Sequence, residues 1–203
     1  YGSTAKFYYS PVYISNVISK VESEIKRSDK KENLTVILVG NSASPTNNHL
    51  SIFEMLLPYK DINVLIYCPL AYGNYPDYKE FVIRKGQELF KEKFNPLTEF
   101  MDFHKYLALL ANVDIAIFNH QRQEAMGVTI QLINLGKVVY MNKSTSSFKS
   151  FTKRGIQVFD NELIMQGGLL TSRDVSRNPD LVKSYYSYEV LIKSLSSVFS
   201  NPE

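Results

Sequence analysis

Disulfides and long apolar runs are missing from this sequence. Its single cysteine, Cys68, excludes a disulfide-stabilised fold and suits a reducing compartment. The longest strongly apolar stretches, 34–39 and 64–70, fall far short of the roughly 20 residues that cross a bilayer. No secretory signal is visible. These absences predict a cytoplasmic protein.

The sequence also lacks a large excess of charge of one sign, and its histidines lack the spacing of metal ligands. The chain has 23 basic and 20 acidic residues, a net charge of +3, which makes no case for a nucleic-acid partner. The three histidines, His49, His104 and His120, show no metal-ligand spacing with Cys68 or with paired carboxylates. We therefore expect neither a metal site nor a nucleic-acid interface.

Three common motifs of α/β enzymes do not occur. No Gly-Lys-Ser/Thr follows a glycine-rich loop, so a P-loop is excluded, and the Gly-x-Gly-x-x-Gly dinucleotide fingerprint is also absent. The Gly-x-Ser-x-Gly elbow of α/β-hydrolases is missing too. A small nucleotide-dependent hydrolase is correspondingly disfavoured.

What is present is the composition of an ordinary globular domain. The chain has 203 residues, 44% hydrophobic and 21% charged, which is enough to bury a full core. It begins with Tyr1 instead of Met, and we expect a piece of a longer protein. We divide it into a segment at 1–33, a Rossmann-like domain at 34–166 and a C-terminal helical tail at 167–203.

Short apolar, β-branched runs alternate with helical patterns. Near-continuous apolar runs suit strands that are buried on both faces of a parallel sheet. The expected strands are 34–39, 63–67, 94–97, 113–118, 137–141 and 156–159, and the expected helices are 50–57, 76–90, 103–110, 127–135 and 146–153. Asp102 is placed to cap the third helix, and Leu191, Leu195, Val198 and Phe199 form a packing stripe near the end. The alternation predicts a doubly wound α/β sheet, Rossmann-like, with helices on both faces.

Ligands of such sheets bind beyond the carboxyl ends of the strands, so the loops there are informative. The loop at 40–49 is small, polar and leads into a helix, which suits phosphate or sugar contacts through unpaired backbone N–H groups. Its candidate binding residues are Gly40, Asn41, Ser42 and Asn48. A plain connecting loop with Asn and Ser caps is the alternative interpretation.

A second polar loop, 119–129, follows the strand at 113–118. A guanidinium such as that of Arg122 grips phosphate with two hydrogen bonds, and Gly127 lets a phosphate approach the next helix. The candidates here are Gln121, Arg122, Gln123, Glu124, Gly127 and Thr129. Alternatively, Arg122 and Glu124 are ordinary surface charges.

Two further loops offer weaker candidates. Tyr72 and Gly73 follow the strand at 63–67 and are placed to line a base or sugar pocket. Glu99 follows the strand at 94–97 and is placed to accept a hydrogen bond from a ribose hydroxyl. Packing for Tyr72 and simple solvation for Glu99 are the alternatives.

These loops resemble those of a known enzyme family. Leu38-Val39-Gly40-Asn41-Ser42 with Asn48-His49 is similar to the first strand and loop of the bacterial TDP-N-acetylfucosamine:lipid II N-acetylfucosaminyltransferases. The runs 106–110, 122–123 and 127–136 fall in the same order as in that family, and 7–11 resembles its crossing between domains. The likeness covers roughly residues 5–160 and is most specific at Val-Gly-Asn-Ser.

The resemblance implies the donor-binding, C-terminal half of a GT-B glycosyltransferase. Such an enzyme transfers a deoxy-amino sugar from a TDP-sugar to a polyprenyl-diphosphate-linked saccharide at the inner face of the cell membrane, as in enterobacterial common antigen. It implies no cofactor, a donor-site wall at Gly40, Asn41 and Ser42, and a crossing segment at 1–33. Arg122, Gln123, Gly127 and Thr129 would face the diphosphate or sugar. The acceptor site would lie on the other half, so we expect little transfer by this chain alone.

One departure from the family concerns the loop that holds Glu124. The enterobacterial enzymes have a second Gln and an additional glycine in this loop, where the present chain reads Arg122-Gln123-Glu124-Ala125-Met126-Gly127. Glu124 then places an anion where the diphosphate would lie, unless it instead binds a sugar hydroxyl, as an acidic residue in this region does in many GT-B enzymes. The donor sugar and the surface glycan stay open, with capsule and O-antigen as alternatives. A non-catalytic α/β nucleotide-binding or interaction module is the competing hypothesis.

Overall fold

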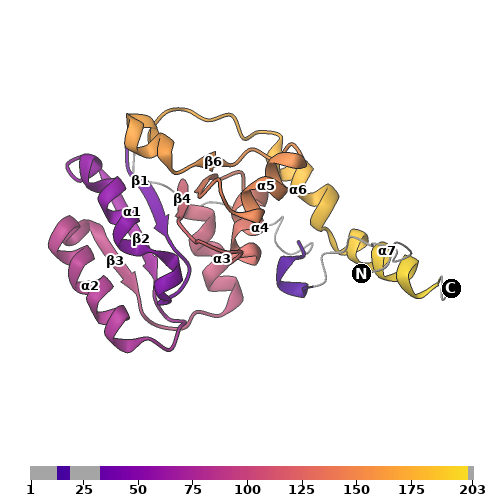
Figure 1. Cartoon of the computed structure of the whole chain (residues 1–203), viewed down its shortest axis with the longest axis horizontal. Helices are drawn as coiled ribbons and strands as arrows, with labels where there is room; N and C mark the ends of the chain where they lie inside the picture. The colour runs from indigo at the N-terminus through magenta and orange to yellow at the C-terminus, as the bar shows by residue number, and fades with distance from the viewer. Residues whose placement is uncertain (1–12, 19–32, 201–203) are drawn as a thin grey trace.

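The computed structural model describes residues 13–18 and 33–200 and places a six-stranded parallel sheet at their centre (Figure 1). The strand order is β3-β2-β1-β4-β5-β6, and every neighbouring pair is parallel. The strands are β1 Thr35–Val39, β2 Val64–Pro69, β3 Phe94–Leu97, β4 Ile115–Phe118, β5 Val138–Met141 and β6 Phe159–Asp160. The predicted doubly wound α/β sheet is confirmed.

The central strand β1 shows why the apolar runs lack alternation. Val36 and Leu38 belong to one core cluster, while Ile37 and Val39 belong to the cluster on the opposite face. All four side chains are at most 6% exposed. A strand that is covered on both faces needs an apolar residue at every position, which is the pattern of a parallel sheet.

The helices cover the sheet in two layers (Figure 1). Side chains of α1 His49–Leu56 and α2 Pro76–Phe90 pack on the face of Ile37. Those of α3 Phe103–Asn112, α4 Met126–Asn134 and α5 Ser146–Lys153 pack on the face of Leu38. The predicted cap of α3 is confirmed, because the Asp102 carboxylate accepts a hydrogen bond of 3.0 Å from the Lys105 amide. Shorter helical turns are η1 Ile14–Asn16, η3 Pro45–Asn47, η4 Leu57–Tyr59, η5 Lys91–Lys93 and η6 Ile164–Gly168.

Both edges of the sheet differ from its centre. The edge strand β3 contains Pro96, which an edge tolerates because it needs fewer backbone donors. At the other edge, β6 pairs only at Phe159 and Asp160, although the sequence predicted a strand over 156–159. Ile156 and Val158 are buried in the core without joining the ladder, so their apolar pattern reported burial and not pairing.

The C-terminal helices are α6 Asn178–Tyr186 and α7 Tyr188–Phe199. Val182 and Tyr186 of α6 belong to the core that also holds α4, and the Ile18 amide donates to the Tyr186 carbonyl at 2.8 Å. α7 extends away from the sheet (Figure 1). Its predicted packing stripe is wrong at Phe199, which is 78% exposed. The proposed domain boundaries remain predictions, and most of the segment 1–33 lies outside the described residues.

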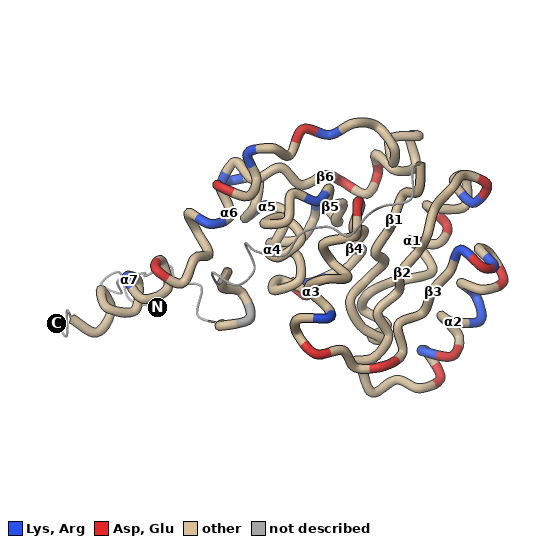
Figure 2. Tube along the Cα trace, turned by 180° about the vertical axis from the view of Figure 1, so that it is seen from behind, with Lys and Arg blue, Asp and Glu red and all other residues tan. Residues whose placement is uncertain are grey.

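Charged residues of both signs are mixed over the surface. Figure 2 shows basic and acidic positions interspersed along α2, where Asp77, Lys79, Glu80 and Arg84 follow one another closely. Within the described ranges, no helix is both long enough and apolar enough to cross a membrane.

Cys68 lies on β2 and is fully buried. It belongs to the core cluster on the α1 and α2 side of the sheet. Because burial disfavours the thiolate, it raises the pKa of the Cys68 thiol. The folded protein therefore keeps this thiol protonated and out of contact with solvent.

Gly86 of α2 lies against the ring of Phe94 on β3, and we predict that Gly86→Ala destabilises the protein. A Cβ at this position would lie 2.4–2.6 Å from ring atoms of Phe94. Alanine normally stabilises a helix interior relative to glycine by about 1 kcal/mol. Here the clash should reverse that sign and cost about 1–3 kcal/mol in urea unfolding. Gln87→Ala, at the exposed neighbouring position, is the control and should change stability by less than about 0.5 kcal/mol. A more stable Gly86→Ala would contradict the packing.

Candidate nucleotide-binding cleft

Strand order reverses between β1 and β4, and the loops that follow these strands meet at that point. β1 pairs with β2 on one side and with β4 on the other. The helices after β1 and β4 lie on opposite faces of the sheet. In open α/β sheets a reversal of this kind leaves a crevice beyond the carboxyl ends of the strands, where ligands bind.

The β1–α1 loop is shaped by one glycine and one buried amide. Gly40 has φ +66°, and a Cβ there would lie 2.7 Å from His49 Nε2 and 2.8 Å from Asn47 Oδ1, so only glycine fits. The Asn47 side chain is fully buried. Its Oδ1 accepts from the Asn41 amide at 2.8 Å, and its Nδ2 donates to Ser42 Oγ at 3.0 Å. One side chain thereby fixes the path of Gly40, Asn41 and Ser42.

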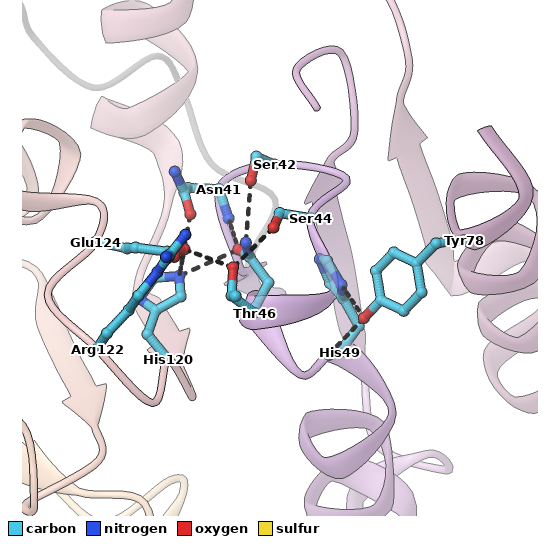
Figure 3. Close-up of polar contacts among 10 residues, drawn as sticks. Asn41, Ser42, Ser44, Thr46, His49, Tyr78, His120, Arg122 and Glu124 are labelled. Atoms are coloured by element: carbon cyan, nitrogen blue, oxygen red, sulfur yellow. Dashed lines mark hydrogen bonds and ion pairs between the residues drawn. The ribbon is translucent and has the colours of Figure 1, made fainter. Parts of the chain in front are cut away.

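The two loops are tied to each other by side chains (Figure 3). His120 Nε2 lies 3.0 Å from Asn41 Oδ1 and 3.2 Å from Asn47 Oδ1. The Thr46 hydroxyl, which is 2.7 Å from Ser44 Oγ, donates to Glu124 Oε2 at 2.9 Å. The contacts of His120 and Glu124 with the β1–α1 loop join residues that are more than 70 positions apart in the chain, and they hold the two loops as one unit.

Glu124 is the acidic residue of this unit, and its charge is compensated. Arg122 Nε forms an ion pair with Glu124 Oε1, while His120 Nε2 lies 4.0 Å from Oε2. The Glu124 side chain is 16% exposed and that of Arg122 is 70% exposed. Burial lowers the pKa of His120, the Glu124 charge raises it, and the Arg122 charge lowers it. Arg122 therefore neutralises Glu124 from the solvent side.

A cleft of about 850 Å³ opens beside these loops. It lies within the range of volumes that small-molecule sites occupy, about 300–1,000 Å³. Seven of the residues predicted from the sequence line it, namely Asn41, Ser42, Tyr72, Glu99, Gln123, Glu124 and Gly127. The topology thus brings candidates from four separate loops to one cavity.

The other predicted residues, all in the described part of the chain, lie outside the cleft lining. Gly40, Asn48 and Gly73 all have positive φ and shape the loops that carry the lining. Thr129 is 1% exposed within α4. Gln121 and Arg122 are exposed, and Arg122 borders a separate small cavity with His120 and Ser147. A direct ligand contact for these residues stays a prediction.

The sequence missed the aromatic side of the cleft. Phe100, Phe103 and Tyr106 line it together with Tyr72, and the Tyr72 and Phe100 rings meet edge to face at 5.7 Å. The sequence predicts a helix over 103–110 but not which of its side chains face a cavity, and Phe103 is 52% exposed. Burial, followed by the nearby Tyr72, raises the pKa of Tyr106. The cluster of aromatics around residue 100 was the available signal.

The N-terminus of α4 opens into the same cleft. Residues 125–128 line it, and Ala125 enters the helix with φ +57°. Among the described residues no side chain caps this end, and its first turn carries no acid. The first amides of a helix lack intrahelical partners and carry positive partial charge, so this end suits an anion.

His49 lies beneath the β1–α1 loop as a neutral group. It is fully buried, and its Nδ1 is 3.1 Å from the Tyr78 hydroxyl. Burial, with a smaller contribution from His120, lowers the pKa of His49 to about 4. Across the described ranges, no group of three or more His, Cys, Asp or Glu residues is arranged to hold a metal ion.

Residues 3–174 match the model of the family described as 4-alpha-L-fucosyltransferase, glycosyl transferase group 56. The chain belongs to this 4-alpha-L-fucosyltransferase family. The match covers the whole sheet and the residues that line the cleft.

Solved glycosyltransferases share the fold of this fucosyltransferase-family chain. A glycosyltransferase from Rickettsia africae ESF-5 superposes with a TM-score of 0.68 at 17% identity, covering 84% of this chain and 48% of the other. The C-terminal domain of the group 1 glycosyl transferase LpcC from Francisella tularensis gives 0.63 at 10% identity, covering 82% and 98%. Anabaena Alr3699/HepE in complex with UDP and glucose gives 0.64 at 13% identity, covering 83% and 48%. The chain thus spans about half the length of two of these three proteins and nearly all of the isolated C-terminal domain.

The neutral His49 predicts a stability loss in mild acid. The unfolded chain binds a proton at the ordinary pKa of 6.5, whereas the folded protein resists it down to about 4. This contribution to stability is complete above pH 6.5 and is lost as the pH falls toward 4. Its partial loss between pH 7 and pH 5 should lower the free energy of unfolding by about 2 kcal/mol.

Urea unfolding of the wild type and of His49→Asn at the two pH values measures this effect. Asparagine keeps a polar partner for Tyr78 without a titrating ring. Between pH 7 and pH 5, the free energy of unfolding of His49→Asn should fall by about 2 kcal/mol less than that of the wild type. Equal losses in the two proteins would show that His49 is not the group responsible.

Proposed function

We propose that this chain is the donor-binding half of a GT-B glycosyltransferase that transfers a deoxy-amino sugar, N-acetylfucosamine-like, from a TDP-sugar. The acceptor would be a polyprenyl-diphosphate-linked saccharide in bacterial surface glycan synthesis. The observation that carries the proposal is the uncapped N-terminus of α4, which opens into an 850 Å³ cleft in a glycosyltransferase-family chain.

The diphosphate would bind at the start of α4. Residues 126–128 of the first turn line the cleft, and the free amides and dipole of a helix N-terminus favour negative charge. As the bond between the sugar and the diphosphate breaks, negative charge grows on the departing nucleotide. Fixed amide dipoles stabilise that charge without reorganisation.

Glu124 stands one residue before Ala125, and its ionised carboxylate would repel a diphosphate. The ion pair with Arg122 and the hydrogen bond from Thr46 offset that charge. The carboxylate still lines the cleft and can accept a hydrogen bond from a sugar hydroxyl. We therefore propose that Glu124 orients the transferred sugar and that Arg122 supports it.

The aromatic side of the cleft would take the nucleobase. Tyr72, Phe100 and Phe103 are at least half exposed, and all three line the cavity. Exposed rings beside a cavity offer stacking surfaces, and a stacked base contributes roughly 1–3 kcal/mol. Glu99, which lines the same side, is placed to accept from a ribose hydroxyl.

The acceptor side is assigned to the part of the enzyme that this chain does not span. An acceptor hydroxyl would attack the anomeric carbon and lose its proton to a general base. The bond between the anomeric carbon and the nucleoside diphosphate breaks, and the nucleoside diphosphate leaves. We place that base, the lipid-linked acceptor and a peripheral contact with the inner face of the membrane on the other half. The resemblance at Val-Gly-Asn-Ser and the family membership support this assignment.

The diphosphate site is tested by Gly127→Asp. An acid in the first turn favours helix formation, so α4 should keep its stability, but its charge should repel phosphate. We expect dTDP to raise the melting temperature of the wild type, and the variant to bind at least about tenfold more weakly in calorimetry.

The matched control for Gly127→Asp is Ser146→Asp. Ser146 is an exposed residue of the first turn of α5 that lies outside the cleft lining. This variant should bind dTDP like the wild type. If neither dTDP nor UDP shifts the wild-type melting temperature at millimolar concentration, the proposed function fails.

The choice of nucleotide is a separate prediction. If the donor is a TDP-sugar, dTDP should bind more tightly than UDP and far more tightly than GDP, since a purine differs in shape from the pyrimidine base. Competition calorimetry with the three nucleotides ranks them. Tighter binding of UDP than of dTDP would reject the TDP donor while keeping the nucleotide-sugar site.

A further inference from the structure

The orientation of the Asn47 amide can be deduced from its neighbours. A backbone N–H can only donate, so the atom that faces the Asn41 amide at 2.8 Å must be the oxygen of Asn47. The nitrogen of the same amide then donates to Ser42 Oγ at 3.0 Å. The buried oxygen is therefore fixed as an acceptor, and whatever else faces it must carry a hydrogen.

What faces it is His120 Nε2, at 3.2 Å. The same nitrogen lies 3.0 Å from Asn41 Oδ1, which is a second acceptor. A ring nitrogen between two amide oxygens is stable only if it is protonated. The geometry thus selects the Nε2–H tautomer of His120, with one hydrogen shared between the two asparagines.

The ring of His120 is held firmly in this place. It is 4% exposed and stacks on Phe118, with centroids 5.5 Å apart and planes inclined by 17°. Phe118 is the last residue of β4, so the donor is attached to the rigid sheet. With so little access to solvent, water is poorly placed to substitute for the ring if the donor is removed.

His120 does not line the cleft, but Asn41 and Ser42 do. His120 contacts Asn41 directly and reaches Ser42 through Asn47. We propose that His120 is a positioning residue, whose Nε2–H acts through Asn41 and Asn47 to fix the β1–α1 loop as the wall of the cleft. Its effect on ligand affinity rests on the proposed nucleotide site, whereas its effect on the loop does not.

Two variants separate the donor from the ring. His120→Phe keeps an aromatic ring on Phe118 but has no hydrogen to donate. His120→Gln loses the stacking but offers an amide N–H near the position of Nε2. If the side chain served only to fill space, Phe would be the better substitute, whereas a positioning role makes Gln the better one.

The loop is measured without ligand. In the wild type, nitrogen-detected NMR of the imidazole should show the Nε2–H tautomer, and an Nδ1–H tautomer would overturn the proposal. Hydrogen exchange of the Asn41 amide should be at least about tenfold faster in His120→Phe and close to wild type in His120→Gln. An unchanged exchange rate in His120→Phe would also overturn it.

The site is measured with dTDP and UDP. We expect His120→Phe to weaken binding by at least about tenfold and His120→Gln by less than about threefold. The double variant His120→Phe/Asn41→Ala should bind little more weakly than the weaker single variant, because both changes disturb the same part of the cleft wall. Additive losses, or affinities that follow the melting temperatures of the variants, would reject the action through Asn41.

These measurements also distinguish the two proposals. If the wild type binds neither nucleotide, the proposed function fails, and the tautomer and the Asn41 exchange rate still decide the role of His120. If nucleotides bind but exchange is unchanged in His120→Phe, the function stands and the positioning role is rejected.

Discussion

The amide of Asn47 has no access to solvent, and a buried amide is costly unless its polar atoms are paired. Every partner of Asn47 lies on one of the two loops that meet where the strand order reverses. The path of Gly40, the position of Ser42 and the distance between the β1 and β4 loops all follow from this requirement. The cleft wall is therefore specified by satisfied polar groups inside the loops, and not by the sheet alone.

The fold was predictable because short apolar runs in this sequence indicate which segments are buried. A strand such as β1, which is apolar from Val36 to Val39, is typical of the middle of a parallel sheet. The failures have the same cause. Ile156 and Val158 are buried without pairing, and Phe199 continues a helical pattern into solvent. Periodicity reports which residues suit an interior, and tertiary structure decides which of them reach one.

The candidate site was predictable to the extent that topology defines it. Loops after parallel strands converge, so Asn41, Gln123 and Gly127 could be expected together before any contact was known. The contact of Asn47 with His120 joins residues 73 positions apart, and neither has a spacing that indicates it. The place of Phe103 in the cleft could not be predicted, because an aromatic residue on a helix has the same pattern whether it faces a core or a cavity.

Cys68 gives the folded chain a natural reporter of its own opening. The thiol is the only one in the sequence, and it lies on β2 at the interior of the sheet, where its raised pKa and full burial prevent reaction. A thiol reagent can label it only after β2 or the helices above it have separated from the sheet. The rate of alkylation therefore measures how often the core opens. Any ligand that holds the loops of β1 and β2 in place would lower this rate without contacting the sulfur.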